Sequence, residues 1–260
     1  MNKPLKADVI VDAFSGVTFA EVKKVLDSSE IKISESKPDF IVMVGGDGTY
    51  LRHAPHNMDI PILKLKGREH GPLGSKGVLY TYSFDSLAAC IRKIKNHDYK
   101  IRTEPVIKCV YNKKTYLSVG DFYIERHGIK QALRYSIDVI TEKARLKIHG
   151  ISNGFIIATP TGSTGYYAYL DVLLGRKKEP IKGIGVAHIL PTYIEENGRH
   201  DLHDGIRRQF KEDVSFTAVL FRERGYLYGV SNLDKGIVIM PNTRVYFKIL
   251  ADKIKLIEFQ

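Results

Sequence analysis

An aspartate set among glycines is the feature of this sequence that points most directly to chemistry. Asp47 stands in the segment Gly-Gly-Asp-Gly-Thr of residues 45–49, directly after the apolar run of residues 40–44. Glycine has no Cβ, so a ligand can approach the backbone of such a loop closely. The apolar run predicts a buried strand, and a short helix that ends at Pro55 follows it. The first N–H groups of that helix could face a phosphate.

The carboxylate of Asp47 distinguishes this loop from a simple phosphate cradle. A carboxylate repels phosphate, so its presence favours a base for a hydroxyl group or an anchor for a metal ion. The alternative is an ordinary tight turn between a strand and a helix, where Gly-Asp-Gly is common. Arg52, about one helical turn past the loop, is the basic residue that we would choose first to reach a phosphate.

A second loop of the same plan occurs later in the chain. The apolar residues 155–158 lead into Thr-Pro-Thr-Gly-Ser-Thr-Gly-Tyr at 159–166. The hydroxyl groups suit phosphate or ribose oxygens, and Tyr166 could stack on a base or a nicotinamide ring. Taken alone, an ordinary turn rich in threonine and serine is the simpler interpretation. The sequence has neither a Walker A loop nor a G-x-G-x-x-G motif after a strand, so a nucleotide would be held in another way.

Composition limits the choice of function. The chain has 260 residues, of which 43% are hydrophobic and 27% charged, which is typical of a globular protein. Its net charge of +11 favours anionic partners, but the basic residues are spread along the chain. No basic stripe alternates with aromatics, so we expect no nucleic-acid partner. Cys90 and Cys109 are expected in the core. The lack of a long apolar span or leader predicts a cytoplasmic protein without membrane attachment.

The first hundred residues predict strands that alternate with helices. Thr18 and Glu21 form a capping-box signature before one helix, and Ser83 can cap another whose apolar face begins at Leu87. This alternation predicts an α/β domain with a parallel sheet. The expected strands are residues 7–13, 40–44, 62–65 and 79–82.

Near residue 101 the hydrophobic period changes from helical to alternating. The second half therefore predicts an all-β domain, and we place the domains at 1–103 and 104–260. Turns are expected at residues 112–114 and 141–143. The expected strands include residues 107–111, 135–139, 214–221, 226–230, 237–240 and 245–250.

Together the two loops resemble the NAD kinase family. The first loop is shared with diacylglycerol, sphingosine and phosphofructokinase-type kinases, and the second narrows the resemblance to NAD kinases and close paralogues. Residues 71–82 resemble a degraded form of the segment after that family's third strand. The resemblance implies an N-terminal α/β domain and a C-terminal β-sandwich, whose last strands return to the first domain. It also implies an active site in the cleft and a homodimer or homotetramer.

The resemblance further implies transfer of the γ-phosphoryl group of ATP to the 2′-hydroxyl of the adenosine ribose of NAD, with Mg²⁺. Asp47 matches the family's acid that helps to deprotonate this hydroxyl, in line with the dominance of positioning and charge in phosphoryl transfer. We assign no residue as a metal ligand. The expected nucleotide-binding residues are Gly45, Gly46, Gly48, Thr49, Arg52, Asp121, Asn153, Thr159, Thr161, Gly162, Ser163, Thr164, Gly165 and Tyr166.

Three polar positions depart from the family pattern. Gly120-Asp121 stands for an Asn-Glu pair, Asn153 for an aspartate, and Ser231-Asn232 for Asp-Gly. Three alternatives stay open: a divergent NAD kinase, a paralogue that phosphorylates a different hydroxyl, and a non-catalytic nucleotide-binding protein. A lipid kinase of the diacylglycerol or sphingosine type would need an apolar groove and membrane attachment, which the sequence does not show.

Other polar clusters are weaker candidates. His200 and His203 share a helical face but lack a third metal ligand, so an exposed loop is the simpler interpretation. The arginines of residues 207–208 and 222–224 could reach a triphosphate, but paired charges on a solvated face explain them equally well. Ser163 lacks the elbow motif of a hydrolase nucleophile.

Overall fold

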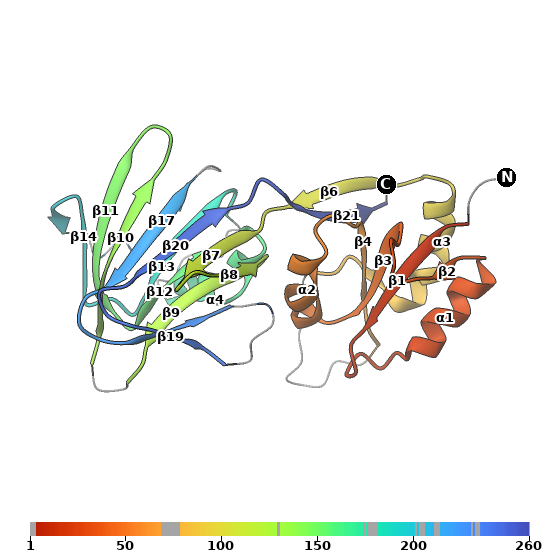
Figure 1. Ribbon diagram of the computed structural model, residues 1–260, viewed down its shortest axis with the longest axis horizontal. Coiled ribbons are helices and arrows are strands. Elements are labelled where there is room, and N and C mark those ends of the chain that lie inside the picture. The colour runs from red at the N-terminus through yellow and green to blue at the C-terminus, as the bar shows by residue number, and fades with distance from the viewer. Residues whose placement is uncertain are drawn as a thin grey trace. The chain divides into compact units, whose positions relative to one another are not determined.

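The structure is a computed structural model that describes residues 4–68, 79–128, 131–173, 175, 181–200, 202, 206–210, 214–229, 231 and 235–259. The chain divides into two compact units (Figure 1). Unit 1 comprises Met1–Glu104 and Asp252–Gln260, and unit 2 comprises Pro105–Ala251. Within the described part of the chain, no helix combines the length and apolar character that a membrane span needs.

Unit 1 contains a seven-stranded sheet of order β2-β1-β3-β4-β21-β6, with β5 paired to β4. All pairings are parallel except that of β21 with β6. A strand from the C-terminus therefore completes a sheet built from the start of the chain. The strands are β1 (Lys6–Val11), β2 (Lys32–Ile33), β3 (Phe40–Gly45), β4 (Ile62–Lys66), β5 (Tyr82–Ser83), β6 (Lys100–Glu104) and β21 (Ile254–Glu258).

Two helices of unit 1, α1 (Phe19–Ser28) and α3 (Leu87–Lys95), each bury an apolar face. Both share an apolar core with the sheet, and α2 (Asp47–His53) follows β3. The predicted face of α3 is confirmed, because Leu87, Cys90, Ile91 and Ile94 are all buried. α2 continues into a 3₁₀ turn, Ala54–His56, which contains Pro55.

Two expectations for the segment before α3 are wrong. Of the expected strand at 79–82 only Tyr82 lies in a strand, the two-residue β5 (Tyr82–Ser83). Ser83 makes no capping hydrogen bond with its side chain, because a 3₁₀ turn, Phe84–Ser86, comes before α3. The carbonyl of Ser83 instead accepts a hydrogen bond of 2.6 Å from Ser86 Oγ.

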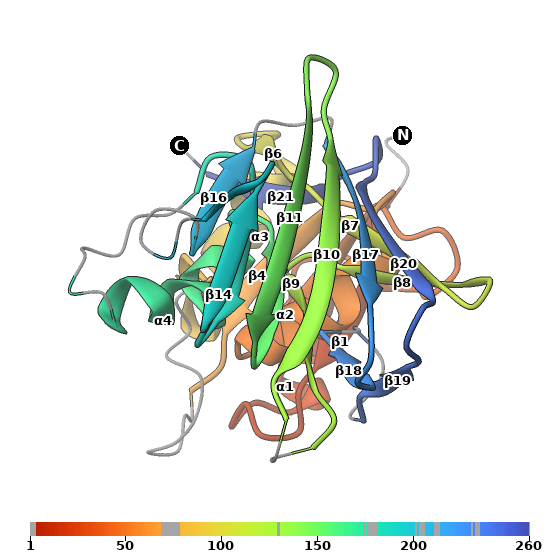
Figure 2. The same cartoon turned by 90° about the vertical axis from the view of Figure 1, so that its left-hand side faces the viewer.

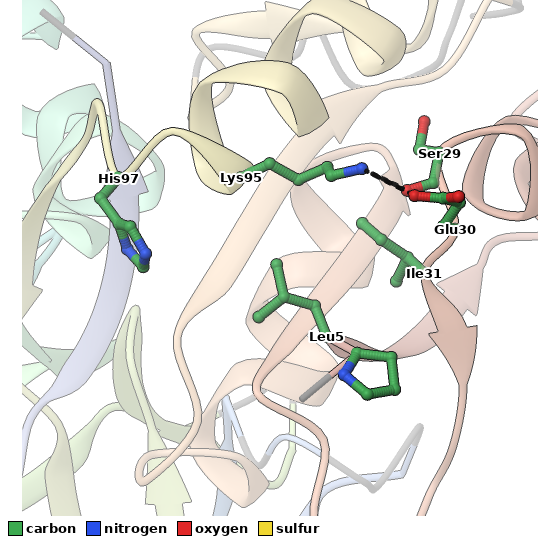
Figure 3. Close-up of a pocket in the computed structure, with 7 residues that line it drawn as sticks. Leu5, Ser29, Glu30, Ile31, Lys95 and His97 are labelled. Atoms are coloured by element: carbon green, nitrogen blue, oxygen red, sulfur yellow. Dashed lines mark hydrogen bonds and ion pairs between the residues drawn. The ribbon is translucent and has the colours of Figure 1, made fainter. Parts of the chain in front are cut away.

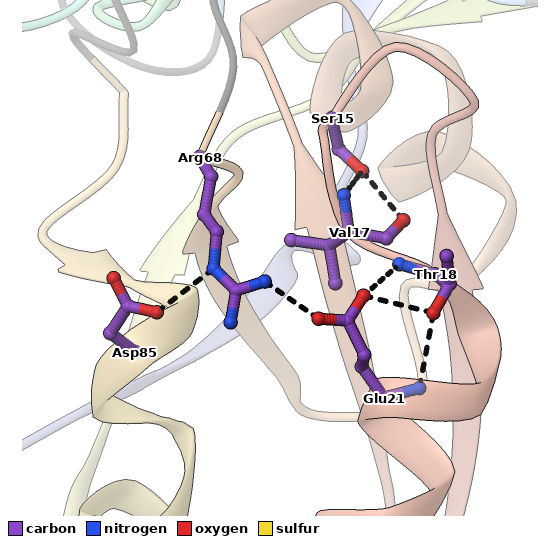
Figure 4. A network of polar contacts seen from close by, with 6 residues as sticks. All are labelled: Ser15, Val17, Thr18, Glu21, Arg68 and Asp85. Carbon is purple, nitrogen blue, oxygen red and sulfur yellow. Dashed lines mark hydrogen bonds and ion pairs between the residues drawn. The ribbon is translucent and has the colours of Figure 1, made fainter.

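A polar network fixes the start of α1 (Figure 4). The predicted capping box is confirmed, since Thr18 accepts a bond from the Glu21 amide and Glu21 accepts one from the Thr18 amide. Arg68 donates to Glu21 at 2.6 Å and to Asp85 at 3.1 Å. The bond from the Thr18 amide and the contact with Arg68 lower the pKa of Glu21 to about 2.

Replacement of Thr18 by alanine is expected to lower the free energy of unfolding by about 1 kcal/mol, the usual effect of losing an N-cap. Thr18→Ser is the matched control, because serine keeps the capping hydroxyl. Urea unfolding curves measure both values. An equal loss in the two variants would contradict the assignment of the effect to the cap.

Unit 2 is built from two antiparallel sheets with a common apolar core. The eight-stranded sheet has the order β15-β14-β11-β10-β17-β20-β7-β8, and the six-stranded sheet has the order β16-β13-β12-β9-β18-β19. Figure 2 shows β14, β11 and β10 of the larger sheet side by side. Large side chains from both sheets share this core, among them Phe122 and Phe155 from one and Phe216 and Phe247 from the other. Cys109 is buried there as a free thiol, as expected.

The strands of unit 2 begin and end close to where the alternation of apolar and polar residues predicts. The expected turns at 112–114 and 141–143 lie in the β7–β8 and β10–β11 hairpins. The strands are β7 (Ile107–Tyr111), β8 (Lys114–Ser118), β9 (Asp121–Arg126), β10 (Leu133–Ile140), β11 (Arg145–Ser152), β12 (Gly154–Ala158), β13 (Ile184–Ile189), β14 (Tyr193–Glu196), β15 (Arg199–His200), β16 (Arg207–Phe210), β17 (Ser215–Leu220), β18 (Gly225–Tyr228), β19 (Ile237–Ile239) and β20 (Arg244–Ile249). The helical elements are a 3₁₀ turn, Gly162–Thr164, and α4 (Tyr166–Leu173).

A buried polar cluster interrupts the apolar interior of unit 2. His188 on β13 is fully buried, and its Nδ1 lies 2.6 Å from the hydroxyl oxygen of Tyr135. That hydroxyl is also 3.0 Å from Ser152 Oγ. The other ring nitrogen of His188, Nε2, is buried without a hydrogen-bond partner among the described residues. Burial lowers the pKa of His188 to about 3.

Candidate functional site

The first glycine loop begins where β3 leaves the core of unit 1. All six residues of β3 are buried, and Gly46 is the N-cap of α2 without a side-chain capping bond. Gly45 is required by packing, since an added Cβ would lie 2.3 Å from Thr49 Oγ1. Gly48 is exposed, and an added Cβ there would meet no atom of the described residues within 4 Å. Gly45 is therefore tightly packed against unit 1, whereas Gly48 lies on the exposed side of the loop.

Thr49 connects the loop to the neighbouring strand. Its side chain is 4% exposed, and Oγ1 donates a 2.7 Å hydrogen bond to Asp12 Oδ2. Asp12 follows β1, and its other oxygen accepts a bond from the Phe14 amide at 2.8 Å. The hydroxyl that we expected beside a phosphate is thus already bonded within unit 1.

Asp47 lies on the half-buried first turn of α2. Its Oδ1 accepts a 3.0 Å hydrogen bond from the Leu79 amide, and the hydroxyl of Tyr80 donates to the Gly46 carbonyl at 2.8 Å. Leu79 and Tyr80 therefore hold the glycine loop, which is why they do not extend the strand at Tyr82. Residues 71–78, the rest of the segment that resembles the kinase family, lie outside the described residues.

A buried lysine, Lys64, packs against Tyr50 of α2, the helix that follows this loop. Lys64 on β4 is 8% exposed, and its Nζ is 4.1 Å from the centroid of the Tyr50 ring. Burial lowers the pKa of Lys64, and the carboxylates of Glu104 and Asp47 act in the opposite direction. The hydroxyl of Tyr50 donates to Glu104, which also pairs with Arg102. Arg52 lies in the exposed last turn of α2.

The second loop is held together by its own hydroxyl groups. Thr159 is fully buried, and its Oγ1 donates to the Val119 carbonyl and accepts a 3.1 Å bond from the Gly162 amide. Ser163 Oγ donates to the Pro160 carbonyl at 2.7 Å. Two hydroxyl groups that we expected to face a ligand therefore bond to the backbone of unit 2.

Fewer residues of the second loop are exposed than expected. Thr164 is exposed, and its Oγ1 donates to the Thr161 carbonyl at 2.9 Å. Gly165 has only one neighbouring atom near an added Cβ, at 3.5 Å. An added Cβ on Gly162, by contrast, would lie 2.3 Å from the Gly120 carbonyl oxygen. Gly162 thus allows the loop to approach the start of β9.

We expect Gly162→Ala to displace the second loop, because its new Cβ meets backbone that cannot move aside easily. The predicted loss is roughly 1–3 kcal/mol in the free energy of unfolding, as for other overpacking substitutions. Gly128→Ala is the control in the same unit, since no atom of the residues that the structure describes lies within 4 Å of its added Cβ. Thermal unfolding compares the two variants, and equal melting temperatures would refute the close approach.

Polar residues of β9 lie beside the second loop. Asp121 is half-buried at the start of β9, and burial raises the pKa of its carboxyl group to about 7. Glu125 accepts a 3.0 Å hydrogen bond from the hydroxyl of Tyr166. The ring of Tyr166 packs edge-on against Tyr123, with centroids 5.5 Å apart.

Tyr166 and Asn153 line the same pocket, of about 270 Å³, together with Glu125 and Arg126. The structure therefore brings two of the expected contacts of unit 2 together. Ser231 is described, but Asn232 lies outside the described residues. His200 belongs to strand β15 rather than to a helix, and His203 is also outside the described residues.

Unit 1 has a pocket of its own, which does not include the glycine loop. It measures about 620 Å³ and is lined by Leu5, Ile31 and Lys95, among others (Figure 3). Lys95 Nζ donates to the carbonyl of Ser29 at 3.0 Å. These residues lie at the amino end of β1, whereas Asp47 follows the carboxyl end of the parallel strand β3. Ligands of open α/β sheets bind at the carboxyl ends of the strands.

In sequence the chain is similar to NAD kinases. It is 25% identical over 146 residues to the NAD kinase of Saccharolobus islandicus, which covers 56% of this chain and 53% of that enzyme. It is 28% identical over 170 residues to the NAD kinase of Clostridium botulinum, with coverages of 59% and 57%. The chain thus matches little more than half the length of these relatives. No family model matches it.

Two solved structures resemble the whole chain. An NAD kinase from Archaeoglobus fulgidus, in complex with ATP, covers 98% of this chain with a TM-score of 0.69 and 16% identity. The chain has the fold of an NAD kinase. Yeast NADH kinase, complexed with NADH, covers all of the chain, with a TM-score of 0.75 and 14% identity. The matches extend over 94% and 84% of the two kinase chains.

Several residues around the glycine loop of residues 45–49 had no clear signal in the sequence. Lys64 interrupts an apolar strand, which could have drawn attention to it. Asp12 could have been noticed only from its place after the first strand. The contacts of Tyr80 and Glu104 join segments that are distant in sequence, so no local pattern predicts them.

Proposed function

We propose that this protein transfers the γ-phosphoryl group of ATP to the 2′-hydroxyl of the adenosine ribose of NAD or NADH. The observation that carries the proposal is Asp47, held in an open glycine loop at the carboxyl end of a buried strand. The similarity to NAD kinases in sequence and in fold supports the same reaction class.

Asp47 acts in this proposal as the base that orients the acceptor hydroxyl and takes its proton. The Leu79 amide bonds one carboxylate oxygen, which fixes the orientation of the group. An oriented carboxylate lowers the barrier mainly by positioning the attacking oxygen. Gly48 leaves space for a phosphate or ribose to approach the loop.

In this proposal the metal is a Mg²⁺ ion that ATP carries. Among the described residues, no group of three histidine, cysteine or acidic side chains could hold a metal ion. Mg²⁺ is commonly held by substrate phosphates, waters and one or two carboxylates. When bound, the ion would neutralise charge on the phosphates, and Asp47 is the carboxylate that could face it.

Residues of unit 2 recognise the acceptor in this proposal. Asn153 and Tyr166 line one pocket and would contact the dinucleotide together with the exposed Thr164 and Gly165. Asp121 would contact the adenosine, and its raised pKa makes it a hydrogen-bond donor in part of the population at neutral pH. We assign Thr159 and Ser163 to the support of this loop.

The experiment that tests the proposal is an activity assay with purified protein, ATP and Mg²⁺. NAD and NADH are offered separately, and the 2′-phosphorylated product is measured by mass spectrometry. We expect product with at least one of the two acceptors and none without ATP. Binding of both ATP and NAD without turnover would favour the non-catalytic alternative. Turnover only with a diacylglycerol or sphingosine acceptor would favour the lipid kinase.

A further inference from the structure

A pocket rich in arginine lies in unit 2, at the end of β9 and the turn between β17 and β18. Its volume is about 710 Å³. Arg222 and Arg224 are exposed on the turn. The residues that line it are Arg126, His127, Gly128, Gln131, Arg222, Glu223 and Arg224.

The acidic residue of this lining is already neutralised. The side chain of Glu223 is only 10% exposed and accepts a 2.6 Å bond from Nη1 of Arg134. A second bond to Glu223, of 3.3 Å, comes from the Arg134 amide. Among the described residues, neither Arg222 nor Arg224 has an acidic partner. The pocket therefore carries an uncompensated positive charge.

Arg208, from the other arginine pair of the sequence, behaves differently. Arg208 donates to both carboxylate oxygens of Glu196, at 2.8 and 2.7 Å. Paired charges therefore account for Arg208, which is one of the two interpretations that the sequence left open. The same interpretation fails for Arg222 and Arg224, because the glutamate between them pairs elsewhere.

The wall of the pocket is fixed by the sheet. Arg126 pairs with Gly225 in the β9–β18 ladder, and the His127 amide donates to the Arg224 carbonyl at 3.0 Å. The His127 ring stacks on Tyr226, with centroids 4.6 Å apart and planes 16° from parallel. The sheet thus holds the backbone of Arg126, His127 and Arg224, which limits the entropy that these residues lose on binding.

We propose that this pocket binds a chain of phosphate groups. Guanidinium groups recognise phosphate oxygens through paired charge-assisted hydrogen bonds. Arg222 and Arg224 supply these groups, and His127 supplies a flat face beside them. The phosphates can belong to an inorganic oligophosphate or to a nucleotide. The site does not depend on the proposed kinase reaction.

The pocket adjoins residues of the proposed acceptor site. Arg126, His127 and Gly128 also line the smaller pocket that contains Asn153 and Tyr166. A ligand could therefore place its phosphates at Arg222 and Arg224 and extend toward Tyr166. An anion without a nucleoside would occupy the arginines alone.

A single reporter tests the pocket without interference from other sites. The chain contains no tryptophan, so Gln131→Trp places the only indole in the lining of the pocket. Tripolyphosphate, ATP and adenosine are titrated against its fluorescence in the full chain. We expect saturation with tripolyphosphate, competition by ATP, no effect of adenosine and weaker binding at higher salt. Competition by ATP alone, with no tripolyphosphate response, would overturn the oligophosphate site.

The arginines are tested in the reporter protein by Arg222→Gln with Arg224→Gln. We expect the Kd for tripolyphosphate to rise by roughly tenfold or more, since charge-assisted bonds are lost. Arg145→Gln with Arg199→Gln is the matched control, because it removes two exposed arginines of the same unit. The control should change Kd less than about twofold, as for screened surface charges. Equal weakening in both proteins would overturn the site, and the kinase assay remains a separate readout.

Discussion

Asp47→Asn is expected to lower the rate of phosphoryl transfer by roughly 10²–10⁴-fold, the usual contribution of a general base. Asparagine has nearly the same shape and can still accept the hydrogen bond from the Leu79 amide. It cannot take a proton from the acceptor hydroxyl. The rate of product formation at saturating ATP and NAD measures the effect, and the KM for NAD should change far less than kcat.

Asp59→Asn is the control for the loss of one negative charge in unit 1, since Asp59 is exposed and lies outside the glycine loop. Its kcat should stay within about twofold of the unsubstituted protein, as for a remote surface charge. Equal kcat values for Asp47→Asn and the unsubstituted protein would show that Asp47 is not the base. A lower melting temperature in Asp47→Asn, but not in Asp59→Asn, would instead show that Asp47 stabilises the fold.

The second large effect is a loss of stability at acidic pH, which we expect from the buried His188. Because the folded-state pKa of His188 is lowered to about 3, the folded protein resists protonation of a ring that titrates near 6.5 in the unfolded chain. Stability from this group is therefore complete above about pH 6.5 and is lost progressively as the pH falls toward 3. At pH 4.5 the predicted loss is about 2–3 kcal/mol relative to pH 7.

His188→Gln tests this dependence, because glutamine can bond to the Tyr135 hydroxyl but does not titrate. The free energy of unfolding, measured with urea, should fall less between pH 7 and pH 4.5 in the folded variant than in the unsubstituted protein. NMR of the unsubstituted protein supplies a second measurement, in which the ring signals of His188 should not titrate above about pH 4. A midpoint near 6 would contradict the buried, neutral ring.

Much of the fold follows from local patterns. The helical spacing of Leu87, Cys90, Ile91 and Ile94 fixes the buried face of α3 because it also fixes which side chains lie together. The alternation around Ile107 and Tyr135 identifies strands for the same reason. Ser83 misled because a serine before an apolar run can precede a 3₁₀ turn as well as a helix.

The candidate site was harder to predict than the fold. A hydroxyl in a turn can bond either to a ligand or to nearby backbone, and local sequence does not distinguish the two. Thr159, Ser163 and Thr164 all donate to backbone carbonyls, and Thr164 alone of the three is exposed. The contacts of Asp47 with Leu79 and of Thr49 with Asp12 depend on chain segments more than thirty residues apart.

The most direct test of the proposed function is hydrogen–deuterium exchange with increasing NAD. The account predicts protection of the peptides that cover residues 40–53 and 155–173, each compared with the same peptide without NAD. Protection of both would support the assignment of Asp47 and of Tyr166 to nucleotide binding. An unprotected peptide at saturating NAD would contradict the assignment of its loop.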